Sequence, residues 1–104
     1  MTLSIVQAEF VDDESGSRHD QAVRVLEFLN VKSGRKFRTN ANTLKPIIAR
    51  LSEGFTVQEC KQVIVRKCRE WKGVTFQNGQ PGDQYLSPFT LFGPINFNKY
   101  VADL

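Results

Sequence analysis

The sequence is poor in the residues from which most catalytic and metal sites are built. Its 104 residues include two cysteines and a single histidine. His19 lies in a polar stretch that we interpret as a linker, so we expect no nucleophile–histidine pair and, without a CxxC motif, no zinc site. Cys60 and Cys68 fall in one predicted helix, about 12 Å apart along its axis, which is too far for a disulfide.

Long apolar runs and phosphate-binding glycine patterns are also missing. The uninterrupted apolar stretches are only a few residues long, so we predict no transmembrane helix, and the N-terminus has neither the basic leader nor the apolar segment of a signal peptide. The seven glycines are scattered, and no GxxxxGK(S/T) motif occurs. Carboxylates for a two-metal site would come only from loop residues, namely Asp12, Asp13, Glu14 and Asp83. We therefore predict a cytoplasmic protein without enzymatic activity, cofactor or metal.

Two segments carry apolar residues at helical spacing and end at glycines, as helices often do. The first begins at Asp20, its predicted N-cap, and ends at residue 33, with Phe28 at the edge of its apolar face. The second is capped by Asn40 or Asn42 and ends before residue 54. We place Pro46 in its first turn, where a missing N–H is tolerated.

The third and longest predicted helix opens with the sequence TVQE. Thr56 and Glu59 form a capping box, in which hydroxyl and carboxylate each accept a hydrogen bond from a backbone N–H that has no partner within the helix. We expect this helix over residues 57–72, with a buried Trp71 near the end of its apolar stripe. Residues 1–11 alternate loosely between apolar and polar side chains, which predicts a short strand or an extended arm.

The C-terminal segment YLSPFTLFGPINFNKYV, residues 85–101, concentrates five aromatic side chains. Exposed rings could stack on the bases of a single-stranded nucleic acid, but such platforms sit in cationic grooves, and Lys99 is the only basic residue here. We therefore predict a structural clasp, with a short turn after Ser87 and a last helix from about Asn96 to Ala102, which folds back on Trp71 and the first helix. Its buried rings should stabilise the domain by about 1.5–3 kcal/mol each.

These elements predict an all-α fold, a compact bundle of three main helices plus a short aromatic C-terminal helical element. We assign residues 20–104 to this domain and residues 1–19 to an extended arm or linker. From Lys32 to Lys72 the domain carries eleven lysines and arginines but only three acidic residues, although the net charge of the chain is only +3. This zone is either a solvated helix surface or a contact for a polyanion such as DNA. The candidate DNA contacts are Arg35, Lys36, Arg38, Lys61, Arg66, Arg69 and Lys72.

Four short motifs stand in an order that resembles the conserved C-terminal domain of phage replication proteins, the replisome organisers that stand beside the DnaD-like primosomal proteins. They are GRKFR at 34–38, ARLSEGFT at 49–56, REW at 69–71 and YLSPFTLFGPINFNKY at 85–100. The resemblance spans roughly residues 22–101. It implies a module that helps to assemble a replisome by contacting DNA, by self-association as a homo-oligomer, or by recruiting the host helicase or its loader.

Proteins of this kind usually carry the domain behind an N-terminal winged-helix part that has no counterpart here. The resemblance therefore implies either a fragment of a replication protein or a freestanding phage protein. A freestanding protein opens a second hypothesis, an effector that binds and inhibits or redirects a host protein. In that case the arm LSIVQAEF would add a strand to the host target or to a second copy of the chain.

Overall fold

The computed structural model of the chain describes residues 14–104, which form a helical domain. Its elements are α2 (Arg18–Ser33), α3 (Ala41–Ser52), α4 (Val57–Trp71), the 3₁₀ turn η1 (Gly82–Tyr85), α5 (Pro88–Leu91) and α6 (Pro94–Ala102). Over this range the only extended pairing is an isolated bridge between Thr75 and Pro81. The all-α prediction is confirmed. The predicted arm, residues 1–11, lies outside the described residues.

Helix α2 begins earlier than the sequence suggested. Ser17 Oγ accepts a hydrogen bond from the Asp20 N–H at 3.1 Å, and Asp20 Oδ2 accepts one from the Ser17 N–H at 3.4 Å. Ser17 is therefore the N-cap of a capping box. The prediction of Asp20 as N-cap was wrong because an acidic residue suits the third helical position as well as the cap. The predicted end is confirmed, since Gly34 follows Ser33 with a φ of 79°, a conformation that favours glycine.

Helix α3 is capped by Asn40, one of the two predicted caps, whose side chain accepts a hydrogen bond from the Thr43 N–H at 3.0 Å. Pro46 does not lie in the first turn, as we predicted, but is the sixth residue of a helix that begins at Ala41. Proline lacks an N–H, so the carbonyl of Asn42 loses its usual helical donor. Asn42 is exposed, and solvent can hydrate that carbonyl.

Helix α4 begins as predicted, with a capping box between Thr56 and Glu59. A second acceptor from far along the chain strengthens this start. The two carboxylate oxygens of Glu14 accept hydrogen bonds from the N–H groups of Val57 and Gln58, each at 2.9 Å. A carboxylate at a helix N-terminus is favoured by both hydrogen bonding and the helix dipole, so Glu14 anchors the chain preceding α2 to α4.

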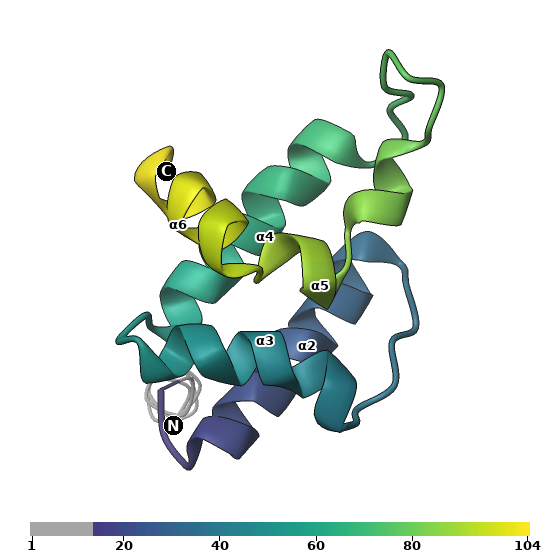
Figure 1. Cartoon of the computed structure of the whole chain (residues 1–104). Helices are drawn as coiled ribbons and strands as arrows, with labels where there is room; N and C mark the ends of the chain where they lie inside the picture. Colours follow the sequence, from purple (N-terminus) through teal and green to yellow (C-terminus); the bar gives the residue numbers. More distant parts are fainter. Residues whose placement is uncertain (1–13) are drawn as a thin grey trace, which may run out of the picture.

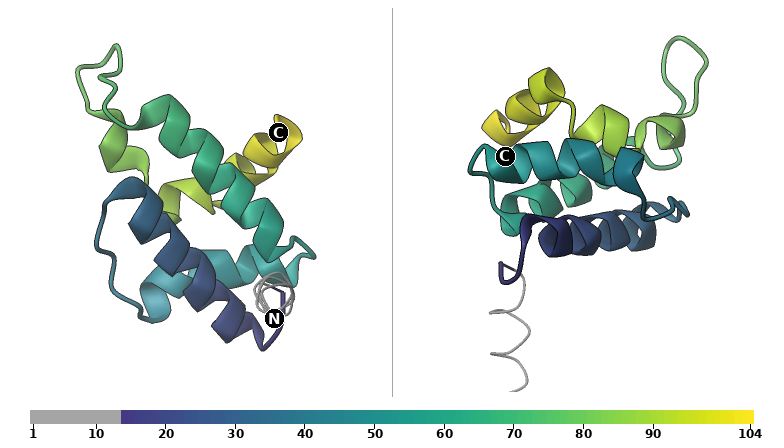
Figure 2. Two further views of the ribbon diagram at one scale, coloured as in Figure 1. Left: turned by 180° about the vertical axis from the view of Figure 1, so that it is seen from behind. Right: turned by 60° about the horizontal axis from the view of Figure 1, so that its bottom comes forward.

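The helices are arranged so that α3 and α4 lie between α2 and the C-terminal elements (Figures 1 and 2). In the right-hand view of Figure 2, α2 lies below α3, and α5 and α6 lie above it. The core joins all three levels. Its fully buried large side chains include Leu26, Leu29, Ile47, Leu51, Ile64, Leu91, Phe92 and Phe97.

The C-terminal clasp, residues 85–101, buries most of its aromatic surface, as predicted. Phe92 and Phe97 are fully buried and stacked with their centroids 5.2 Å apart, and Phe97 meets the edge of Phe55 at 4.9 Å. Two details differ from the prediction. The clasp packs mainly on α3 and α4 rather than on α2, and the ring of Phe89 is 56% exposed.

Trp71, which we predict from the sequence to be buried, is only partly buried. It ends α4 in an aromatic cluster that joins this helix to the clasp. Its ring meets the edges of Phe76, Tyr85 and Tyr100 at centroid distances of 5.9, 6.4 and 5.9 Å. The backbone of Gly82 also packs closely against the end of α4, because a Cβ on Gly82 would lie 2.3 Å from the Trp71 carbonyl oxygen. Only glycine fits at that contact, which fixes the loop between α4 and η1 against the end of the helix.

Candidate nucleic-acid interface

Helix α4 presents two opposite stripes of side chains. The inner stripe is buried and consists of Val57, Cys60, Val63 and Ile64. The outer stripe follows the three- and four-residue spacing that places side chains on one helix face. It consists of Gln58, Lys61, Gln62, Val65, Arg66 and Arg69. Because the inner stripe packs into the core, the polar and cationic side chains of the opposite stripe face outward.

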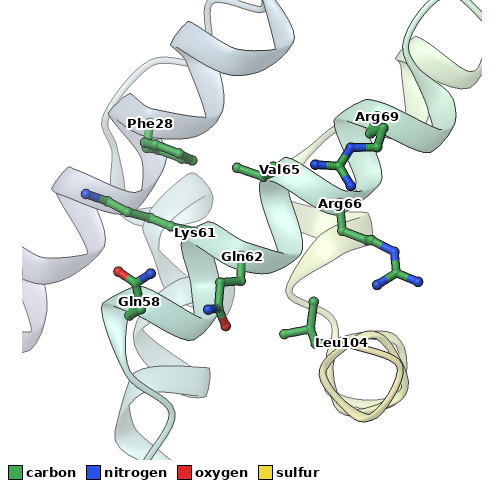
Figure 3. Close-up of a pocket in the computed structure, with 8 residues that line it drawn as sticks. All are labelled: Phe28, Gln58, Lys61, Gln62, Val65, Arg66, Arg69 and Leu104. Atoms are coloured by element: carbon green, nitrogen blue, oxygen red, sulfur yellow. The ribbon is translucent and has the colours of Figure 1, made fainter.

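The outer stripe of α4 forms one wall of a groove of about 370 Å³ (Figure 3). Phe28 from α2 and Leu104 from the C-terminal end complete the lining, and we call this hollow the α2–α4 groove. Three of the seven predicted DNA contacts, Lys61, Arg66 and Arg69, line it. The structure thus brings these three cations together around exposed apolar side chains.

A neighbouring hollow of about 440 Å³ extends this surface along α2. It shares Phe28 and Lys61 with the α2–α4 groove. Its other lining residues are Arg24, Glu27, Val31 and Lys32. Together the two hollows are lined by five cationic side chains and one acidic side chain, which makes the surface strongly attractive to a polyanion.

The cations of α4 are not all equally available. Glu70 accepts hydrogen bonds from Lys67 Nζ at 2.9 Å and Arg66 Nε at 3.0 Å, and these bonds, first that of Lys67, lower the pKa of the Glu70 carboxyl. The side chain of Lys67 is 12% exposed and lies over the rings of Trp71 and Tyr100, so it packs against the clasp rather than facing the groove. Arg69 is exposed and makes no ion pair within residues 14–104.

Phe28 is a feature of the site that sequence reasoning missed. Two ammonium groups lie near its partly buried ring: Lys61 Nζ is 5.1 Å and Lys32 Nζ 5.5 Å from the ring centroid. The sequence held a signal, because Arg24 and Lys32 stand four residues before and after Phe28 and so share its helix face. The apolar spacing of α2 places Phe28 at the edge of the buried face, which is where a ring can reach both the core and solvent.

The other predicted cations lie elsewhere or have internal partners. Arg35 Nη1 donates a hydrogen bond to the Asp83 carbonyl at 2.8 Å, and its guanidinium lies 4.8 Å from the Phe37 centroid. Lys72 Nζ donates to the Lys32 carbonyl at 3.2 Å, at the end of α4.

Lys36 and Arg38 are exposed in the connector between α2 and α3. The connector runs along the side of α2 that faces away from α4 (Figure 2, left). It is held there by Asn30, whose side chain exchanges two hydrogen bonds of 2.9 Å with the backbone of Phe37. These two cations are therefore not part of the α2–α4 groove.

A second groove, of about 560 Å³, lies between α3 and the clasp and has a different character. The exposed ring of Phe89 lines it beside Pro46 and Lys45. Arg50 also lines it, but its side chain is only 7% exposed and is paired with Glu53 at 3.1 Å. Two cations line this groove, of which only Lys45 is exposed, whereas three line the α2–α4 groove.

The cysteines do not offer a reactive thiol. Both are free; Cys60 is fully buried and Cys68 is partly buried. Burial, with smaller contributions from Glu59 and Glu14, raises the pKa of the Cys60 thiol to about 12, and burial also raises that of Cys68. Neither thiol is therefore a good nucleophile at neutral pH.

Two searches of the described residues complete the survey. Among residues 14–104 no three histidine, cysteine, aspartate or glutamate side chains come together in a way that could hold a metal ion. None of the helices in this range is both long and apolar enough to cross a membrane.

Comparison with known proteins identifies a family for the chain. The family model described as "Conserved phage C-terminus" matches residues 25–102. No curated protein and no solved structure matches the chain. The matched range agrees closely with the range over which the four sequence motifs indicated a phage C-terminal domain.

Proposed function

Because the chain belongs to the conserved phage C-terminus family, we propose that it is a non-enzymatic module of phage DNA replication that contacts DNA through the α2–α4 groove. It would act in the cytoplasm of the bacterial host. The observation that carries this proposal is the convergence of Lys61, Arg66 and Arg69 on one groove. The replication context comes from the resemblance of the four motifs to replisome organisers.

Phosphate contacts explain why the groove suits DNA. Lysine and arginine side chains that neutralise phosphates release counterions, so the affinity falls as salt rises. Among the groove cations we expect the strongest contact from Arg69, because it is exposed on the outer stripe of α4 and makes no ion pair within residues 14–104. Arg66 shares its guanidinium with Glu70. Arg35 and Lys72 already donate to backbone carbonyls, and we expect smaller contributions from them.

Lys36 and Arg38 lie outside the α2–α4 groove, so they would form a separate contact. DNA bound in the groove could reach them only by crossing α2. Recruitment of a host helicase or its loader, and self-association, remain predictions of the resemblance. The effector hypothesis depends on residues 1–11, which the structure does not describe, and it also remains a prediction.

The experiment compares two double variants that remove the same charge. Lys61→Ala/Arg69→Ala removes two groove cations, whereas Lys45→Ala/Lys99→Ala removes two exposed cations from α3 and α6. Fluorescence anisotropy with a labelled 15-nucleotide DNA over a range of salt concentrations measures affinity and salt slope. We expect the groove variant to bind more weakly and to flatten the slope by about 1.4, at about 0.7 per phosphate of a single strand.

The control variant should stay close to the wild type in slope. Equal losses in the two variants would show that net charge, not the groove, governs binding. If the wild type bound neither single-stranded nor double-stranded DNA at low salt, the DNA-binding function itself would be refuted. Circular dichroism of each variant separates loss of contact from loss of fold.

A further inference from the structure

The α2–α4 groove combines an aromatic ring with several cationic side chains, whereas the aromatic C-terminal segment contains only one basic residue. Lys61 and Lys32 place ammonium groups 5.1 and 5.5 Å from the centroid of Phe28, while Arg69 lies farther along the same groove. Val65 and Leu104, which are 36% and 47% exposed, add apolar surface to the lining. Phosphates alone would not require this apolar surface.

We propose that the ligand of the α2–α4 groove is a single-stranded nucleic acid, one base of which stacks on Phe28. This inference rests on the proposed function and names its ligand class. Proteins that bind single strands combine a cationic groove that follows the backbone with aromatic side chains that take the bases. Phe28 supplies the ring, and Lys61, Lys32 and Arg69 supply the charge.

The stacking position is compatible with the lysines that now lie near the ring. An ammonium group about 5 Å from an aromatic centroid gains only a modest cation–π energy when it is exposed to solvent. The stem of a lysine is flexible, so Lys32, which is exposed, can turn outward to a phosphate beside the base. The ring itself is held at the groove by α2, whose inner residues are fully buried.

The shape of the site disfavours a duplex. A helix that reads double-stranded DNA must project its outer face into the major groove. The outer face of α4 is instead hollowed, with Phe28 on one side and Leu104 on the other (Figure 3). A duplex could touch the cations at the rim, but it could not bring a base to Phe28.

The test uses the whole chain and two variants matched in chemistry. Phe28→Leu keeps an apolar side chain in the groove but removes the ring, and Phe89→Leu does the same for the exposed ring of the clasp. The probes are a 15-nucleotide thymidine strand, an abasic strand with the same number of phosphates, and a 15-base-pair duplex. Phe28→Tyr, which retains a ring, serves as the rescue variant.

We expect the wild type to bind the thymidine strand more tightly than the abasic strand and the duplex. Phe28→Leu should weaken thymidine-strand binding about fivefold or more, the loss expected for one stacked base, and leave the salt slope unchanged because no phosphate contact is lost. Affinity for the abasic strand should change less than twofold. Phe28→Tyr and Phe89→Leu should behave like the wild type.

Several results would overturn the inference. Equal wild-type affinity for thymidine and abasic strands would show that no base is stacked, and tighter binding of the duplex would show that the ligand is double-stranded. Equal losses for all probes on Phe28→Leu would assign the ring a structural role. In each of these cases DNA still binds, so the proposed function survives, whereas absence of binding to every probe would remove both.

Discussion

The clasp and the α2–α4 groove use aromatic side chains in opposite ways. In the clasp, Phe92 and Phe97 are fully buried against each other and against α3 and α4. In the groove, the single ring of Phe28 is partly exposed, and the ammonium groups of two lysines lie 5.1 and 5.5 Å from its centroid. The C-terminal segment, which is richest in aromatic residues, is therefore structural. Phe28, a single phenylalanine in α2, instead has the partial exposure and the cationic neighbours that base stacking requires.

The same contrast holds for the cations. Lys67 and Arg66 stand next to each other in the sequence, yet Lys67 lies over the rings of Trp71 and Tyr100 and Arg66 lines the groove. Both donate to Glu70. The direction in which a side chain leaves its helix, rather than its charge, decides whether it stabilises the fold or remains available to a ligand.

The largest expected effect comes from opening the clasp. Phe97→Ala removes a fully buried ring that contacts Phe55 and Phe92, and we expect it to lower the free energy of unfolding by about 3–5 kcal/mol. This is a large part of the roughly 5–15 kcal/mol that stabilises a typical domain. Urea denaturation followed by circular dichroism measures the change.

Phe89→Ala is the matched control for the clasp. Its ring is 56% exposed, so its removal should cost well under half as much as Phe97→Ala. A clasp that contributed little to stability would give nearly equal midpoints for the two variants, and the assignment of residues 85–101 to structure would then be wrong.

The smallest expected effect lies where the two regions meet, at Glu70. Glu70→Gln releases Arg66 and Lys67 from their shared carboxylate, so affinity for single-stranded DNA should rise about twofold. Stability should change by no more than about 0.5 kcal/mol, because exposed ion pairs contribute little. Glu27→Gln removes the same charge beside the groove without releasing a paired cation, so a rise of the same size in that variant would argue against specific release.

The pH dependence at Glu70 has a definite sign. Because its pKa is lowered in the folded protein, the pair adds stability above the ordinary pKa of a glutamate carboxyl. This contribution is lost as the pH falls through the lowered value. Glu70→Gln should therefore flatten the acid side of the stability curve slightly, which denaturation midpoints at a series of pH values would reveal.

Local signals in the sequence were enough to predict most of the fold. The TVQE box fixed the start of α4, Gly34 marked the end of α2, and helical spacing identified the buried stripes. The start of α2 was misplaced because Ser17 and Asp20 exchange hydrogen bonds, and the sequence alone does not say which is the cap. Pro46 was misplaced because the carbonyl that loses its donor belongs to the exposed Asn42, so the helix tolerates a proline beyond its first turn.

The site was less predictable because it depends on contacts between distant segments. Lys61, Arg66 and Arg69 could be grouped from their spacing on one helix. The pairing of Phe28 with Lys61, the contact of Arg35 with Asp83 and the capping of α4 by Glu14 join residues far apart in the sequence. The periodicity within one helix carries no information about such contacts. Which cations have internal partners and which are available to a ligand could therefore be decided only from the structure.

One measurement addresses the central comparison directly, a titration of the ¹⁵N-labelled chain with the 15-nucleotide thymidine strand followed by amide chemical shifts. The account predicts that the largest shifts map to Phe28 and to the outer stripe of α4, from Gln58 to Arg69, while the buried clasp residues Phe92 and Phe97 change little. Shifts concentrated in residues 85–101, with the α4 stripe unaffected, would contradict it.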